Sequence, residues 1–376
     1  PEAFNRPNRI SIYLNFFAQN LYSLIRYKCI CPKVLSAHVL EFYAIARIIV
    51  ALFGSAMIVI AYLIGEEFTP RWGLLAALAT ALFPSFVYHS HLITPDIPIT
   101  FFSLLMILLT LRFLRRPRAR LLVALTILAA VNTLEKYPGL ISFGLVAYCL
   151  FVQESEGGLR GKILFARWFS LCLQYGLGYL FAIYILSPTL FLNFGRLLKC
   201  LIGETKPNYL GMAQLGWAGK LQFYGRCFLA SGGGALMAVS ALAGLAFAFV
   251  RGEQRKVAPL CYGIFYWSLL SFVGPYWERW AQPMYTAPLL LSMYGLRRLW
   301  DLGKGRWLEA GRVALSLVAG LSFSAMLVIS VANVASFRAT DTRVAALYAM
   351  RKRGITDEEC VAEGYLRLAD QGSSDP

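Results

Sequence analysis

Charged side chains are scarce in this sequence, and their scarcity excludes a soluble fold. Asp, Glu, Lys and Arg make up 15% of the 376 residues, whereas hydrophobic residues make up 58%. Soluble domains carry about 25% charged residues. The chain also lacks a phosphate loop, a Gly-x-Ser-x-Gly elbow and the cysteine spacing of a zinc site or disulfide framework. We therefore expect a membrane protein with no nucleic-acid partner, despite a formal charge of +16.

Long apolar stretches alternate with short polar connections along the chain. A bilayer span needs about 20 mostly apolar residues, and backbone amides inside lipid require helices. The sequence therefore predicts an all-α, polytopic transmembrane helix bundle. Its ten expected spans lie at residues 43–64, 71–88, 97–114, 120–135, 138–152, 166–190, 227–249, 257–275, 283–298 and 313–335.

Basic residues gather in alternate connections, which predicts the orientation of the bundle. Connections rich in arginine and lysine face the cytoplasm in most membrane proteins, and here they lie at residues 112–120, 160–167, 251–256 and 297–312. The intervening connections at 89–96, 136–138 and 276–282 then lie on the exoplasmic side. We expect a multi-pass protein of the inner (plasma) membrane whose active face is exoplasmic (periplasmic).

Several segments are too polar to cross a bilayer. Residues 10–28 mix apolar and polar side chains, which predicts a helix lying flat in the interface. The long loop at 191–226 is expected to hold a second surface helix and to cover the exoplasmic face. We predict a membrane domain at 1–335 and a short exoplasmic tail at 336–376, where Thr356 begins a capping box. Because the chain opens on Pro1 in an exoplasmic segment, we expect a further span upstream.

Ionisable residues are almost absent from the expected spans themselves. Ion-coupled transporters place polar sites near the bilayer midplane, and this chain shows no such site. The exoplasmic connections instead collect polar groups: His89, His91, Asp96, Lys136, Glu278 and Arg279. A carboxylate beside cations suits transfer from a phosphate-activated donor, because the acid orients or removes the acceptor proton and the cations neutralise the leaving phosphate.

Each of these residues also has a structural interpretation. Asp96 could cap the helix that starts at 97, and Lys136 could be an interfacial anchor. Glu278 and Arg279 could pair only with each other. We expect no cofactor, with a divalent metal held by His89, His91 and Asp96 as the alternative.

Three motifs resemble one family of membrane enzymes. They are "YHSHLITPDIPITFF" at 88–102, "TLEKYPGL" at 133–140 and "YWERWAQPMYTAPLLL" at 276–291. Each is similar to an element of the GT-C glycosyltransferases that use polyprenyl- or dolichyl-phosphate sugars, such as protein O-mannosyltransferases and the lipid A aminoarabinose transferase. The resemblance covers about residues 8–345.

The resemblance implies an inverting transfer of a sugar from a lipid phosphate to an acceptor hydroxyl on a lipid, glycan or protein. By position, Asp96 would be catalytic, and Lys136 and Arg279 would contact the donor phosphate. Substrate-binding roles would fall to Glu278, His89 and His91. The family's acidic motif in the first exoplasmic loop is missing, since only Glu2 precedes position 41. We expect that motif upstream of Pro1.

Two other functions stay open. A lipid-linked sugar transporter or flippase could also lack midplane charges, although it must receive headgroups on both faces and the polar residues here gather on one. A catalytically inactive membrane subunit is favoured only if the upstream sequence also lacks the acidic motif.

Overall fold

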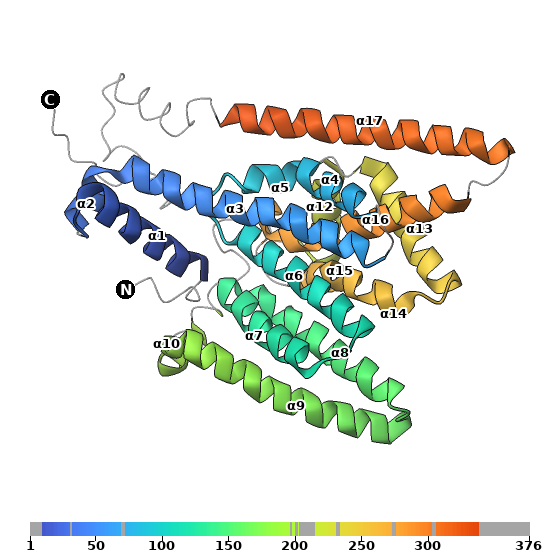
Figure 1. Ribbon diagram of the computed structural model, residues 1–376, viewed down its shortest axis with the longest axis horizontal. Coiled ribbons are helices and arrows are strands. Elements are labelled where there is room, and N and C mark those ends of the chain that lie inside the picture. The colour runs from blue at the N-terminus through green and yellow to red at the C-terminus, as the bar shows by residue number, and fades with distance from the viewer. Residues whose placement is uncertain are drawn as a thin grey trace. The chain divides into compact units, whose positions relative to one another are not determined.

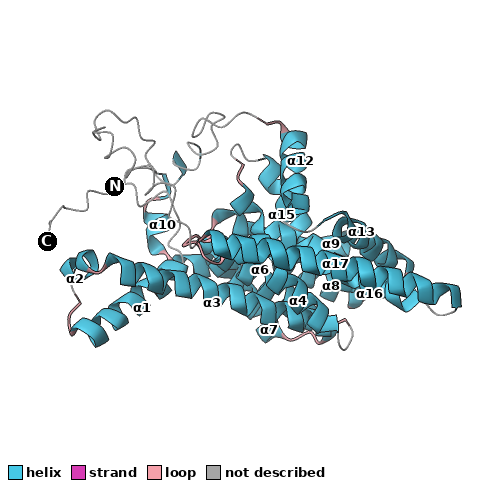
Figure 2. Ribbon diagram, turned by 90° about the horizontal axis from the view of Figure 1, so that it is seen from above, coloured by secondary structure: helices cyan, strands magenta, loops and turns pink. Residues whose placement is uncertain are grey.

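The computed structural model describes residues 10–30, 32–68, 72–195, 198–199, 202, 215–230, 234–272, 276–302 and 306–337. Throughout these ranges the chain forms helices and loops without a strand (Figure 2), so the predicted all-α class is confirmed. The chain divides into a large compact unit that ends at Ser330 and a second unit that begins at Val331. Glu2, Thr356 and the expected tail lie outside the described residues.

The helices are labelled in Figure 1 in chain order. They are α1 (Ile10–Tyr27), α2 (Pro32–Ala37), α3 (Val39–Glu66), α4 (Trp72–Leu82), α5 (Pro84–His89), α6 (Asp96–Arg115), α7 (Ala119–Glu135), η2 (Tyr137–Ser142), α8 (Phe143–Glu156), α9 (Gly161–Leu186), α10 (Pro188–Leu192), α12 (Trp217–Phe228), α13 (Gly234–Val250), α14 (Gln254–Val257), η5 (Ala258–Cys261), α15 (Tyr262–Phe272), η6 (Glu278–Ala281), α16 (Gln282–Leu302) and α17 (Arg306–Ser336).

Five helical segments of the described chain are long and apolar enough to cross a membrane: Val39–Glu66, Asp96–Arg115, Tyr137–Glu156, Gly161–Leu186 and Glu309–Ser336. The other five predicted spans fall short of that length or apolarity. The span expected at 71–88 is broken between α4 and α5, where Pro84 begins a new helix, and α16 carries Pro288 in its interior. Proline has no amide to continue a helix.

The core of the large unit is built around α6 and α16. In the most apolar window of α6, 78% of the residues are buried inside the protein, against 17% in α9. Helix α13 packs on α16 at a close crossing, where a Cβ on Gly295 would collide with the backbone of Ser240. Two backbones can approach that closely only without side chains between them. Helices α6 and α16 are therefore surrounded by protein, while α9 exposes most of its apolar surface.

Helix α1 has its polar side against the protein and its apolar side outward. Ser11 and Ser23 are buried, and the amide of Gln19 donates to the backbone oxygen of Phe42 in α3. Phe16 and other large apolar residues of the helix are exposed. This arrangement is expected of a helix that lies in a membrane interface.

The predicted cover at 191–226 is only partly described, since residues 203–214 lie outside the described ranges. Helix α12 forms its end and packs against α15 and η6. Tyr224 of α12 is fully buried, and the ring of Phe223 contacts that of Tyr276 edge-on. The aromatic residues of this loop therefore attach α12 to the segment that leads into η6.

Candidate functional site

The site is built around an ion pair between two helix ends. A connection of three residues turns α6 back into α7, so the start of α6 and the end of α7 lie together. Nζ of Lys136 lies 2.5 Å from Oδ1 of Asp96. Asp96 is 2% exposed, whereas the side chain of Lys136 is 16% exposed. Burial makes each partner depend on the other, because an unpaired charge in such a place is costly.

The interpretation of Asp96 as a helix cap is wrong. Helix α6 begins at Asp96 itself, Pro95 occupies the capping position, and no side chain caps the helix. A proline at that position has no side-chain acceptor to offer the first amides. The Asp96 carboxylate is used instead for Lys136, and the backbone oxygen of Asp96 accepts the hydroxyl of Thr100 at 2.6 Å.

His89 lies beside the ion pair. It ends α5, is 6% exposed, and its Nδ1 has no hydrogen-bond partner. Burial lowers the pKa of His89 to about 4; the carboxylate of Asp96 acts in the opposite direction, and the cations of Arg279 and Lys136 lower the pKa further. The imidazole is therefore neutral at pH 7 and can both donate and accept a hydrogen bond.

Arg279 reaches the same place from η6. Its guanidinium lies 5.3 Å from the ring centre of Trp277, and Nζ of Lys136 lies 4.8 Å from that of Trp280. The two tryptophan rings contact each other edge-on at 4.6 Å. Cation–π contacts orient both cations. The structure thus brings together Asp96, Lys136, His89 and Arg279.

Glu278 and His91 have other neighbours. Glu278 is exposed and interacts electrostatically with Cys227 and Tyr285. The Nδ1 of His91 binds the backbone oxygen of Val87 at 2.8 Å. In the described part of the chain, no three His, Cys, Asp or Glu side chains are grouped so that they could hold a metal ion. The proposed grouping of His89, His91 and Asp96 is therefore not formed.

Two further residues at the site could not be found from the sequence. Tyr266 of α15 is completely buried, its hydroxyl has no hydrogen-bond partner, and it interacts electrostatically with Asp96. Glu135, directly before Lys136, is buried and accepts the backbone amide of Ser11 at 3.0 Å. In the sequence, Tyr266 looks like any aromatic residue of an apolar segment, and Glu135 looks like a residue at a helix end.

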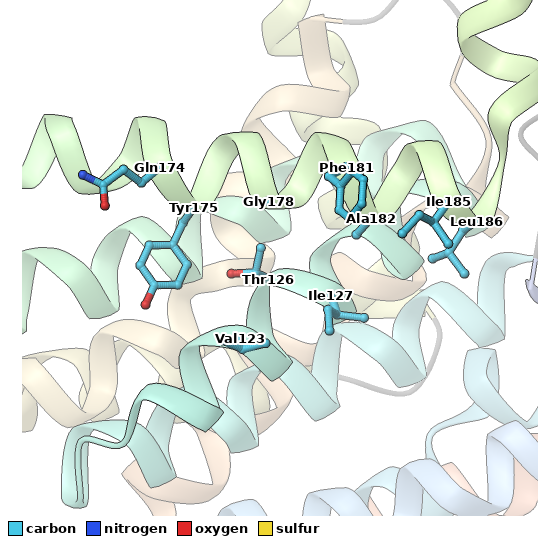
Figure 3. Close-up of a pocket in the computed structure, with 10 residues that line it drawn as sticks. All are labelled: Val123, Thr126, Ile127, Gln174, Tyr175, Gly178, Phe181, Ala182, Ile185 and Leu186. Carbon is cyan, nitrogen blue, oxygen red and sulfur yellow. The ribbon is translucent and has the colours of Figure 1, made fainter.

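A groove of about 620 Å³ lies between α7 and α9 (Figure 3). Its lining from α7 is Val123, Thr126 and Ile127, and the facing residues of α9 lie between Gln174 and Leu186. The lining is mostly apolar. Because α9 is apolar enough to cross a membrane, the groove is suited to a hydrocarbon chain rather than to a polar ligand.

Comparisons with known proteins agree with this architecture. Residues 41–191 match the family model of dolichyl-phosphate-mannose-protein mannosyltransferases. No curated protein sequence matches the chain significantly. A crystal structure of the Archaeoglobus fulgidus oligosaccharyltransferase, complexed with zinc and sulfate, is similar with a TM-score of 0.52 and 16% sequence identity.

That similarity covers 99% of this chain and 50% of the oligosaccharyltransferase, so the chain spans about half the length of that protein. The family match includes α6, the end of α7 and the ion pair of Asp96 with Lys136. The expected fold is confirmed by these two findings together. The chain is a helical, multi-pass membrane protein with the GT-C glycosyltransferase fold.

Proposed function

We propose that this protein transfers a sugar, with inversion, from a polyprenyl-phosphate donor to an acceptor hydroxyl at the exoplasmic face of the plasma membrane. The observation that carries the proposal is the buried carboxylate of Asp96 held by Lys136, with Arg279 close by. The acceptor is a hydroxyl of a lipid, glycan or protein.

The chemistry needs one base and a place for a leaving phosphate. The acceptor oxygen attacks the anomeric carbon, the bond from that carbon to the phosphate oxygen breaks, and the phosphate leaves with both electrons. Lys136 and Arg279 neutralise it, the arginine through a planar fork that matches two phosphate oxygens. Asp96, released as Lys136 turns to the phosphate, takes the proton of the acceptor hydroxyl.

The neutral ring of His89 and the two tryptophans complete the site in this proposal. A neutral imidazole does not repel the cations and can bind a sugar hydroxyl through its unpartnered Nδ1. The half-buried rings of Trp277 and Trp280 offer apolar faces beside the cations. Glu278 and His91 have no role in this mechanism, because their established contacts lead elsewhere.

The groove between α7 and α9 is the place that we assign to the hydrocarbon chain of the donor. Helix α7 lines the groove at Ile127 and ends at Glu135, directly before Lys136. Nine residues of helix separate Ile127 from Lys136, which is about 14 Å along the axis. A phosphate at Lys136 is therefore within a few isoprene units of the groove.

The test is transfer by the full-length protein in lipid nanodiscs, supplied with a panel of polyprenyl-phosphate sugars and with acceptors. Asp96→Asn and Arg279→Ala should each lower the rate about 100-fold or more. Arg47→Ala is the matched control, because Arg47 also lies over an aromatic ring, that of Tyr43 at 5.0 Å. Normal transfer by both site variants would refute the proposal, and movement of the donor without a glycosidic product would indicate a flippase.

A further inference from the structure

Asp96 faces an electrostatic difficulty in the proposed reaction. It is almost completely buried, and its carboxylate has one charged partner, Lys136. When Lys136 turns to the donor phosphate, the carboxylate loses that partner in a place where an unpaired charge costs several kcal/mol. Another group must then hydrogen-bond the charged form, or Asp96 takes up a proton and cannot act as a base.

Tyr266 is placed to be that group. Its side chain is fully buried on α15, which packs against η2, the segment that follows Lys136. Its hydroxyl has no hydrogen-bond partner, and it interacts electrostatically with Asp96. A buried hydroxyl without a partner is unusual and calls for an explanation. One turn earlier, the hydroxyl of Tyr262 is already engaged by Ser103.

We propose that Tyr266 is a positioning residue, whose hydroxyl donates a hydrogen bond to the Asp96 carboxylate once Lys136 has turned to the donor phosphate. This inference rests on the proposed function. It accounts for a buried donor that is uncommitted in the resting structure, because its acceptor is then occupied by Lys136. The titratable neighbours of Asp96 are Lys136, His89 and Tyr266, and Arg279 acts on the same group through His89.

A matched control exists in the same core. Tyr285 of α16 is also buried with an unpartnered hydroxyl, but it interacts electrostatically with Glu278 and Cys227 rather than with Asp96. Tyr266→Phe and Tyr285→Phe each remove one oxygen and keep the ring. Any general effect of losing a buried hydroxyl should therefore be equal in the two variants.

The first experiment is steady-state kinetics of both variants across pH. Tyr266→Phe should lower kcat about 10-fold and leave the KM for the donor unchanged. It should also move the acid limb of kcat to higher pH, because the charged carboxylate has lost a donor. Tyr285→Phe should behave as the wild type. Unchanged kcat and acid limb in Tyr266→Phe, or equal changes in both variants, would overturn the inference.

The second experiment does not depend on transfer. Infrared difference spectra of the protein against Asp96→Asn report the protonated carboxyl of Asp96, recorded with sugar-free polyprenyl phosphate added. In Tyr266→Phe this band should appear at higher pH than in the wild type, and in Tyr285→Phe it should not move. A shift seen in a protein that transfers no sugar would sustain Tyr266 while the proposed function fell; an unmoved band in Tyr266→Phe would sink the role of Tyr266 alone.

Discussion

The carboxylate of Glu135, the last residue of α7, accepts hydrogen bonds from both the backbone amide and the hydroxyl of Ser11 in the first turn of α1. Glu135 is completely buried, and a negative charge is favoured at a helix N-terminus. The next residue, Lys136, holds Asp96. Two consecutive residues therefore join the interfacial helix to the ion pair of the site.

This contact predicts that Glu135→Ala loosens α1. The change leaves the buried amide and hydroxyl of Ser11 without an acceptor, which should cost about 1–3 kcal/mol. Hydrogen–deuterium exchange should become faster in residues 10–27. Glu156→Ala is the control, because its ion pair with Arg255 is exposed and should contribute little. Unchanged exchange in α1 would show that Glu135 does not hold the helix.

The ion pair predicts a large non-additive effect on stability. Lys136→Met leaves Asp96 buried and unpaired, which should lower the free energy of unfolding by about 3–5 kcal/mol. The double variant Lys136→Met with Asp96→Asn removes the stranded charge and should recover part of that loss. Denaturant unfolding of the single and double variants in detergent measures the coupling. Strictly additive losses would mean that the two side chains do not depend on each other.

His89 predicts a loss of stability in acid. Its pKa is lowered from 6.5 to about 4 in the folded protein, so the unfolded chain binds its proton first as the pH falls. The stabilisation is complete above pH 6.5 and decreases toward pH 4, by roughly 3 kcal/mol in all. In His89→Gln the unfolding free energy should depend less on pH across this window. A variant with the same pH profile as the wild type would contradict the assigned shift.

The groove predicts a dependence on the length of the donor chain. Gly178 lines the groove, whereas its neighbour Leu177 is 69% exposed on α9. Gly178→Trp should fill the groove and raise the KM for a long-chain polyprenyl-phosphate sugar about 10-fold, since each displaced CH₂ removes about 0.8 kcal/mol of burial. A short-chain donor should be unaffected. Leu177→Trp is the control, and a groove that holds only ordinary membrane lipid would leave both donors unchanged.

Composition and periodicity were sufficient to predict helices, the membrane environment and five of the ten spans. They failed for the other five because an apolar helix in the middle of a bundle reads like one that faces lipid. Helix α16 is one example: protein buries almost all of it as far as Leu296. A hydropathy pattern also cannot show that a segment such as 71–88 is broken at Pro84.

The site divides in the same way. The residue types and their places at helix ends were enough to single out Asp96, Lys136, His89 and Arg279, because rare polar groups stand out in an apolar chain. The sequence left the direction of each side chain open, so it favoured a helix cap for Asp96 that the structure replaces with Lys136.

The amino-acid sequence by itself determined the helical membrane class and the few polar residues with which this protein can do chemistry. Only the tertiary structure decided which of them meet, and it added Tyr266 and the contact of Glu135 with Ser11. The physical reason is that hydropathy and helix periodicity are local properties of the chain. Ion pairs and buried hydrogen bonds depend on the packing of helices that lie 40 to more than 120 residues apart.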